Sequence, residues 1–134
     1  MTHSGGPIQR IRAKATPGTG ELAPLDESLQ LLISRPGEIM GVEVFNPDLV
    51  SKAYLKVYNA SQTTGVTAGT TIPVQEFELL PNRLTMLRGF EHYDPEHCGT
   101  GIVLQCTLNR GADNTPPGTD CLGEIKYSQQ AGGL

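Results

Sequence analysis

Ionisable side chains that could do chemistry gather in one short segment, residues 91–98 (EHYDPEHC). The side chains that could bind zinc or another transition metal are those of His92, Asp94, His97 and Cys98. A metal site needs three or four ligands at about 2.0–2.3 Å, usually from separate segments that the fold holds rigid. Here the candidates are all local, Pro95 stiffens the segment, and the remaining histidine is His3. The sequence therefore favours a solvated loop or a contact between subunits over a metal site.

Nucleophilic catalysis has even less support. Cys98 is close in sequence to His92 and His97, but neighbours in a loop rarely adopt the geometry that a Cys–His pair requires. The GxSxG motif is absent, and the Gly-x-x-Gly spacings fall in expected arms and loops instead of between a strand and a helix. We therefore expect no catalytic residue, no cofactor and no enzymatic activity.

A basic and aromatic stripe is expected on the segment 50–59 (VSKAYLKVYN). Its alternation predicts a half-buried strand whose other face carries Lys52, Tyr54, Lys56 and Tyr58. Aromatic rings beside cations could stack on single-stranded nucleic acid. However, the net charge of the chain is −4, whereas nucleic-acid-binding domains normally carry a basic surface. We expect an ordinary solvated strand face and no direct nucleic-acid partner.

The N-terminal segment is basic. Residues 1–20 contain no Asp or Glu, so all 14 acidic residues lie in the rest of the chain. The basic residues of this segment are Arg10, Arg12 and Lys14. Residues 1–24 are rich in Gly and Pro and poor in large apolar residues, which predicts an extended arm with a short strand at Ile8–Ala13. Two interpretations stay open: a solvated basic tail, or an arm that lies across an acidic partner surface.

Residues 25–134 predict one all-β domain. Segments rich in β-branched and aromatic residues recur between turn signals of Gly, Pro and Asn. The expected strands are 27–34, 38–45, 50–59, 72–79, 83–90, 101–108 and 120–128, with a bulge at Gly123. About seven or eight short strands at this spacing are typical of an antiparallel β-sandwich or a jelly-roll-like barrel. The aromatic rings expected in its core are Phe45, Tyr54, Tyr58, Phe77 and Phe90.

The three cysteines, Cys98, Cys106 and Cys121, are expected to be reduced and buried, because their number is odd and no CxxC spacing occurs. The N-terminus lacks the apolar stretch of a signal peptide. No apolar run approaches the length of about 18 residues that a membrane-spanning helix needs. The sequence favours production in a cytoplasm, without a membrane partner.

Segments between Leu31 and Tyr127 resemble, in order and spacing, a group of short structural proteins of bacteriophage virions. The segments are Ile33-Ser34 with Pro36-Gly37, Gly41-Val42 and Asn46; Tyr54-Leu55-Lys56 with Tyr58-Asn59-Ala60; Gly69-Thr70 with Ile72-Pro73-Val74 and Pro81; and Gly101-Ile102-Val103-Leu104 with Thr107, Asp113 and Tyr127. None of them is a catalytic motif. Residues 1–24 and 91–98 are not part of the resemblance.

The resemblance implies a capsid decoration (cement) protein that binds the outer surface of the head and stabilises contacts between capsomers. It implies the major capsid protein as partner and a homo-oligomer, with a trimer favoured over a dimer. It further implies a location on the virion after assembly in the host cytoplasm. Arg10, Arg12 and Lys14 would then be contacts of the arm with the capsid. The alternatives are a tail, collar or fibre-attachment component, or a receptor- or carbohydrate-binding β-sandwich module.

Overall fold

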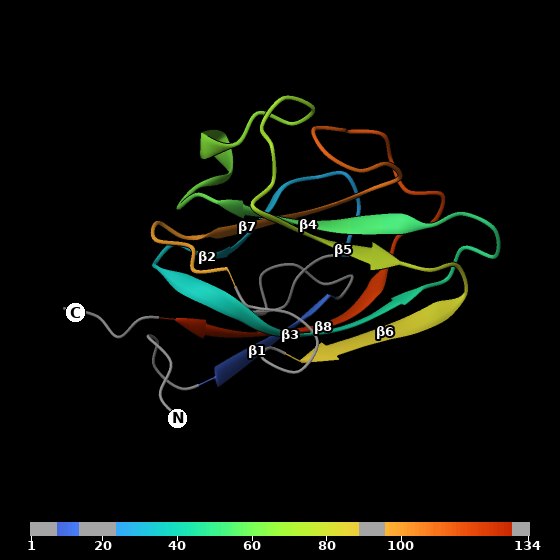
Figure 1. Ribbon diagram of the computed structural model, residues 1–134, viewed down its shortest axis with the longest axis horizontal. Helices are drawn as coiled ribbons and strands as arrows, with labels where there is room; N and C mark the ends of the chain where they lie inside the picture. Colours follow the sequence, from blue (N-terminus) through green and yellow to red (C-terminus); the bar gives the residue numbers. More distant parts are fainter. Residues whose placement is uncertain (1–7, 14–23, 89–95, 130–134) are drawn as a thin grey trace.

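The structure, a computed structural model, describes residues 8–13, 24–88 and 96–129 (Figure 1). These residues form eight β-strands and one 3-10 turn, Thr63–Gly65. The strands are β1 (Ile8–Ala13), β2 (Gln30–Ile33), β3 (Gly37–Asn46), β4 (Ala53–Asn59), β5 (Gln75–Leu79), β6 (Arg83–Arg88), β7 (Ile102–Thr107) and β8 (Leu122–Gln129). The predicted all-β fold is confirmed. Within these ranges no helix is long and apolar enough to cross a membrane.

The strands form two four-stranded antiparallel sheets that lie one above the other in Figure 1. The lower sheet has the order β1-β8-β3-β6, and the upper sheet has the order β2-β7-β4-β5. The first strand pairs with the eighth, the second with the seventh, the third with the sixth and the fourth with the fifth. This is the pairing of one long hairpin, and rolling it up places β3 beside β8 and β4 beside β7. The fold is therefore a double-sheet jelly roll.

Apolar side chains fill the space between the two sheets. Val42 and Val44 on β3, and Leu55 and Val57 on β4, are almost completely buried. They alternate along each strand with residues that point away from the core, as period-two burial requires. The core therefore lies between the central strands of the two sheets.

Two loops, residues 60–74 and 108–121, lie over the outer face of the upper sheet, at the top of Figure 1. Beneath them a second, smaller apolar cluster forms around Tyr58, Val66 and Val103. As a result β7 is buried on both of its faces along its whole length. The central strand β7 and most of β4 are therefore covered on both sides, whereas Glu76 and Glu78 on β5 remain exposed.

The prediction of a bulge at Gly123 is wrong. The register of β3 with β8 passes through the pair Val44–Gly123 without a shift, and the irregularity lies between Ile39 and Gly41. Gly123 is needed for another reason: a Cβ there would collide with the backbone oxygen of Glu43 and with the Cα of Val44. The residue permits close approach of two strands.

The strand expected in the N-terminal arm is formed and is an edge strand of the lower sheet. Its backbone pairs with β8, so that Arg10 stands opposite Lys126 and Arg12 opposite Glu124. Lys14 and the remainder of the predicted arm, residues 1–7 and 14–23, lie outside the described residues. Part of the predicted arm is thus built into the sheet of the domain.

Gly101, the residue before β7, leaves no room for a side chain. A Cβ there would lie 2.5 Å from the backbone oxygen of Ala60 and 2.8 Å from that of Ile33. We expect Gly101→Ala to lower the free energy of unfolding by about 3 kcal/mol, because backbone atoms of two segments would have to shift. Gly99 has no atom within 4 Å of such a Cβ, and Gly99→Ala is the matched control, with an expected change below about 0.5 kcal/mol. Chemical denaturation measures the free energy of unfolding of both variants. Equal values would contradict the close approach of the Ala60 and Ile33 backbones to Gly101.

Candidate functional site

The predicted metal-binding segment is described only in part. His92 and Asp94 lie outside the described residues. His97 is about half exposed, and its Nδ1 lies 3.8 Å from Oε1 of Glu38. In the described part of the chain no three His, Cys, Asp or Glu side chains are placed to hold a metal ion. A site that includes His92 and Asp94 stays a prediction.

The fourth candidate ligand, Cys98, is buried beside β3. Its backbone forms a two-bond bridge with Gly37, with N···O distances of 2.8 and 3.0 Å. Burial, together with the nearby carboxylates of Glu96 and Glu38, raises the pKa of the Cys98 thiol to about 11. Since the thiolate is the form that attacks and binds metals, this environment fits a structural cysteine at neutral pH.

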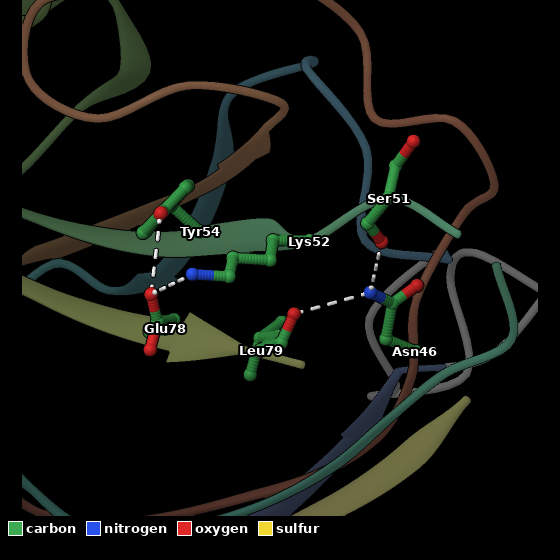
Figure 2. Close-up of polar contacts among 6 residues, drawn as sticks. All are labelled: Asn46, Ser51, Lys52, Tyr54, Glu78 and Leu79. Carbon is green, nitrogen blue, oxygen red and sulfur yellow. Dashed lines mark hydrogen bonds and ion pairs between the residues drawn. The ribbon is translucent and has the colours of Figure 1, made fainter. Parts of the chain in front are cut away.

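The predicted exposed stripe on the upper sheet is divided by the covering loops. Its members are Lys52, Tyr54, Lys56 and Tyr58. The expectation of a solvated face is wrong for Lys56 and Tyr58, which are buried. Figure 2 shows that Lys52 and Tyr54 both bind Oε2 of Glu78, at 3.1 and 3.3 Å. Arg110 lies over the Tyr54 ring, 5.5 Å from its centre, so that the ring is already occupied by a cation.

Lys56 holds the 108–121 loop onto the upper sheet. Its Nζ donates a hydrogen bond of 3.2 Å to the backbone oxygen of Asp113. Close by, the backbone N–H of Gly111 donates to Oε2 of Glu76 at 2.7 Å. Burial lowers the pKa of Lys56, while the carboxylates of Asp113 and Glu76 oppose that effect. The lysine acts as a support for the loop and is not open to a ligand.

Gln105 completes this support from the neighbouring strand β7. Its Oε1 accepts a hydrogen bond of 2.7 Å from the hydroxyl of Tyr58. Its Nε2 donates to the backbone oxygen of Glu27 at 2.8 Å and to Oδ1 of Asn114 at 2.7 Å. A buried amide with its donors and its acceptor satisfied fixes the segments that it joins. The stripe that looked like a binding face is therefore the anchor of a loop.

A shallow depression of about 590 Å³ lies at one end of the upper sheet. It is lined by Ser51, Lys52, Tyr54, Leu108, Asn109 and Arg110. Small-molecule sites are normally concave and apolar, with a few convergent polar groups. Here Lys52 is paired with Glu78, and Arg110 lies over the Tyr54 ring. The depression therefore lacks polar groups that converge on one point and are available to a ligand.

The outer face of the lower sheet carries exposed apolar side chains. Leu84 on β6 stands opposite Phe45 on β3, and Phe45 stands opposite Leu122 on β8. These side chains are 54%, 36% and 45% exposed, and Met86, two residues along β6, is 54% exposed. We call these four residues the apolar row. Contiguous exposed apolar side chains mark interaction surfaces on soluble proteins.

The β3–β4 loop presents two more apolar side chains at the same end of the sandwich. Leu49 and Val50 are 77% and 84% exposed. The loop follows β3 directly after Phe45 and Asn46. The backbone N–H of Asn82 donates to the oxygen of Asp48 at 2.8 Å, which holds this loop beside the β5–β6 turn, at the right of Figure 1.

The loop has a fixed conformation although its tip is exposed. The completely buried Asn46 donates through Nδ2 to the backbone oxygens of Ser51 and Leu79, at 3.0 and 3.1 Å (Figure 2). Its Oδ1 accepts from the N–H of Asp48 at 3.1 Å. Oδ1 of Asp48 in turn accepts from the N–H groups of Val50 and Ser51, at 2.9 and 2.7 Å. Because the loop is already ordered, a partner that contacted it would not have to order it.

The sequence alone does not reveal this surface. Phe45 was expected in the core, and this is wrong, because it lies on the outer face of β3. The sequence does contain a signal: Phe45 shares the phase of Glu43, whereas Val42 and Val44 share the other phase with the core. Leu84 and Met86 likewise share one phase of β6, and Leu87 takes the other.

Comparison with known proteins finds no relative. No family model, no curated protein and no solved structure matches the chain. The jelly roll itself serves capsid proteins, lectins and cupins, so fold alone does not identify a function.

The buried Asn46 side chain is the part of the loop that a substitution tests most directly. Asn46→Ala removes two donated hydrogen bonds and leaves the buried carbonyl of Leu79 without this donor. We expect the free energy of unfolding to fall by about 2–3 kcal/mol and the amides of residues 48–51 to exchange faster. The control is Asn59→Ala, which removes one exposed bond from the N–H of Thr100 and should cost less than about 1 kcal/mol. Unchanged exchange in Asn46→Ala would show that the loop is held by other contacts.

The carboxylate of Asp48 predicts a pH dependence of the same loop. Hydrogen bonds from the N–H groups of Ser51 and Val50 lower the pKa of Asp48 from its ordinary value of 3.8. Because the pKa of Asp48 is lower in the folded than in the unfolded protein, its carboxylate stabilises the fold at pH values above the ordinary pKa. This stabilisation is lost as the pH falls through the folded pKa. The amide proton shifts of Val50 and Ser51 should be constant above about pH 4 and change below it. In Asp48→Asn, which keeps an acceptor but cannot titrate, this change should be absent. A transition in that variant, or one centred above 3.8 in the native protein, would contradict the assignment.

Proposed function

We propose that the protein is a bacteriophage capsid decoration protein that binds the outer surface of the head and stabilises contacts between capsomers. The observation that carries the attachment is the apolar row, together with the fixed loop that exposes Leu49 and Val50. The assignment to a phage head rests on the resemblance of the sequence to short virion proteins. The proposed partner is therefore the major capsid protein, and no catalytic step belongs to the function.

The apolar surface supplies the free energy of attachment. Burial of apolar area contributes roughly 25 cal/mol per Å², so six side chains of this size contribute several kcal/mol when a partner covers them. Association costs translational and rotational freedom. A homo-oligomer, for which we favour a trimer over a dimer, would repeat the contact and add avidity.

The N-terminal basic residues provide a second contact in this proposal. Arg10 and Arg12 lie on β1 in the same sheet as the apolar row. An acidic strip on the capsid would attract them, and added salt would weaken that attraction by screening. Deletion of residues 1–24 would also remove an edge strand, so replacement of the three cations Arg10, Arg12 and Lys14 by Gln is the cleaner variant.

The proposal is tested by co-sedimentation of the purified protein with capsids that lack it. The double variant Leu84→Lys, Met86→Lys places charges in the apolar row, and we expect its affinity to fall by about tenfold or more. The matched control is Ile72→Lys, because Ile72 is 76% exposed in the 60–74 loop over the other sheet. This control should bind like the native protein, at a saturable and fixed copy number per capsomer. Thermal unfolding of each variant verifies that the fold is retained.

The outcomes separate the parts of the proposal. Equal binding by the double variant and the control would remove the apolar row as the contact surface. Full binding by the Arg10, Arg12 and Lys14 variant, with no effect of salt, would remove the basic contact. Failure of the native protein to bind capsids would end the decoration hypothesis, and binding to purified tails instead would establish a tail, collar or fibre-attachment role.

A further inference from the structure

Two of the three cysteines form a buried pair. Cys106 lies on β7 in the upper sheet, and Cys121 is the residue before β8 in the lower sheet. Their sulfur atoms lie 3.9 Å apart, and both side chains are completely buried. Two sulfur atoms at this distance are in van der Waals contact, and a disulfide requires a further approach to about 2.05 Å. The fold has therefore placed two thiols, one on each side of the 108–121 loop, side by side in the core.

The backbone around the pair is fixed. Cys121 forms a two-bond bridge with Leu25, with N···O distances of 2.9 and 3.0 Å. The N–H of Cys106 donates to the backbone oxygen of Asp26 at 2.7 Å. Both cysteines are thus held by the same segment, residues 25–26, and this keeps their side chains in register with each other.

We propose that Cys106 and Cys121 are a latent cross-link site, reduced when the protein is made and joined as a disulfide once it reaches an oxidising medium. The pairing rests on the geometry alone, whereas the passage from cytoplasm to oxidising medium rests on the proposed virion function. With oxidised glutathione as oxidant, one thiolate attacks the glutathione disulfide and releases one glutathione. The second thiolate then attacks the mixed disulfide and releases the other. Two protein thiols are oxidised, one disulfide forms, and glutathione disulfide is reduced to two thiols.

The cross-link would close the loop that covers the upper sheet. The residues between the two cysteines include Gly111, Asp113 and Asn114, which make the contacts with Glu76, Lys56 and Gln105. A disulfide around a loop of this length removes conformational freedom from the unfolded chain. The oxidised protein is therefore more stable, and its loop is held by a covalent bond in addition to hydrogen bonds.

Burial controls when the cross-link forms. The contact with Cys121 and burial together raise the pKa of the Cys106 thiol well above its ordinary value. The Cys106 thiolate is thus scarce in the closed structure, and oxidised glutathione cannot reach either sulfur while both side chains are completely buried. Oxidation therefore requires local opening of the 108–121 loop, so that it is slow in the folded protein and accelerates with temperature.

The test is oxidation of the full chain, purified under reducing conditions, with oxidised glutathione at temperatures up to just below the unfolding midpoint. We expect the intact mass to fall by that of two hydrogen atoms and peptide mapping to join Cys106 to Cys121. The melting temperature should rise by roughly 10 °C. The control is Cys98→Ser, which removes the third thiol and should behave like the native protein. Cys106→Ser and Cys121→Ser should show neither the mass loss nor the rise.

Three results would overturn the inference: three thiols that persist after this treatment, a disulfide that includes Cys98, or glutathione adducts without an internal disulfide. All are measured on the isolated protein. They are independent of capsid binding, which the reduced protein tests separately. A disulfide in a protein that binds no capsid would leave the pair in place and remove only its virion context.

Discussion

The apolar contact between the inner faces of β3 and β8 and those of β4 and β7 is the interaction on which the rest of the structure depends. Val44, Leu55, Leu104 and Ile125 have no exposed surface, and only the rolled hairpin brings these strands together. Because side chains alternate along a strand, burial of the inner faces sends every second residue outward. The two outer faces then differ. Loops of the chain cover the central strands of the upper one, whereas the apolar row of the lower one remains exposed.

The cover of the upper sheet depends on polar groups that are costly to bury. An ammonium loses hydration in the interior, which is why the pKa of Lys56 is lowered. An apolar residue at this position would avoid that cost but could not fix a particular loop conformation. Hydrogen bonds from Lys56 and Gln105 reach the backbone of Asp113 and the side chain of Asn114. These directional contacts select one arrangement of a segment that contains no large apolar residue between Leu108 and Cys121.

The sequence predicts local features well, because each depends on neighbouring residues. Alternation identifies the strand around Tyr54 to Tyr58, and the Asn46-Pro47 turn signal ends β3 where the structure ends it. The sequence does not decide between a jelly roll and a sandwich of another strand order. The deciding feature is the pairing of β1 with β8, which joins the two ends of the chain. The sequence places Lys56 and Tyr58 on a solvated face because alternation does not show which loops fold back over the sheet. Lys56 binds Asp113 of the 108–121 loop, and Tyr58 packs with Val66 of the 60–74 loop. The apolar row escapes prediction because Phe45, Leu84 and Leu122 come from three separate strands.

Charged residues lie next to the apolar row, and they would limit which partners could bind there in the proposed function. Along the outer face of the lower sheet, the next register pair on β3 and β8 is Glu43–Glu124, and the pair after it brings Lys126 beside Gly41. Both ends of the edge strand β6 carry exposed arginines, Arg83 and Arg88. Charges on an edge strand oppose pairing with another strand edge, so the strand resists non-specific aggregation. In the proposed attachment the apolar row would supply affinity, while Glu43, Glu124 and Lys126 beside it would disfavour a partner whose charges do not match.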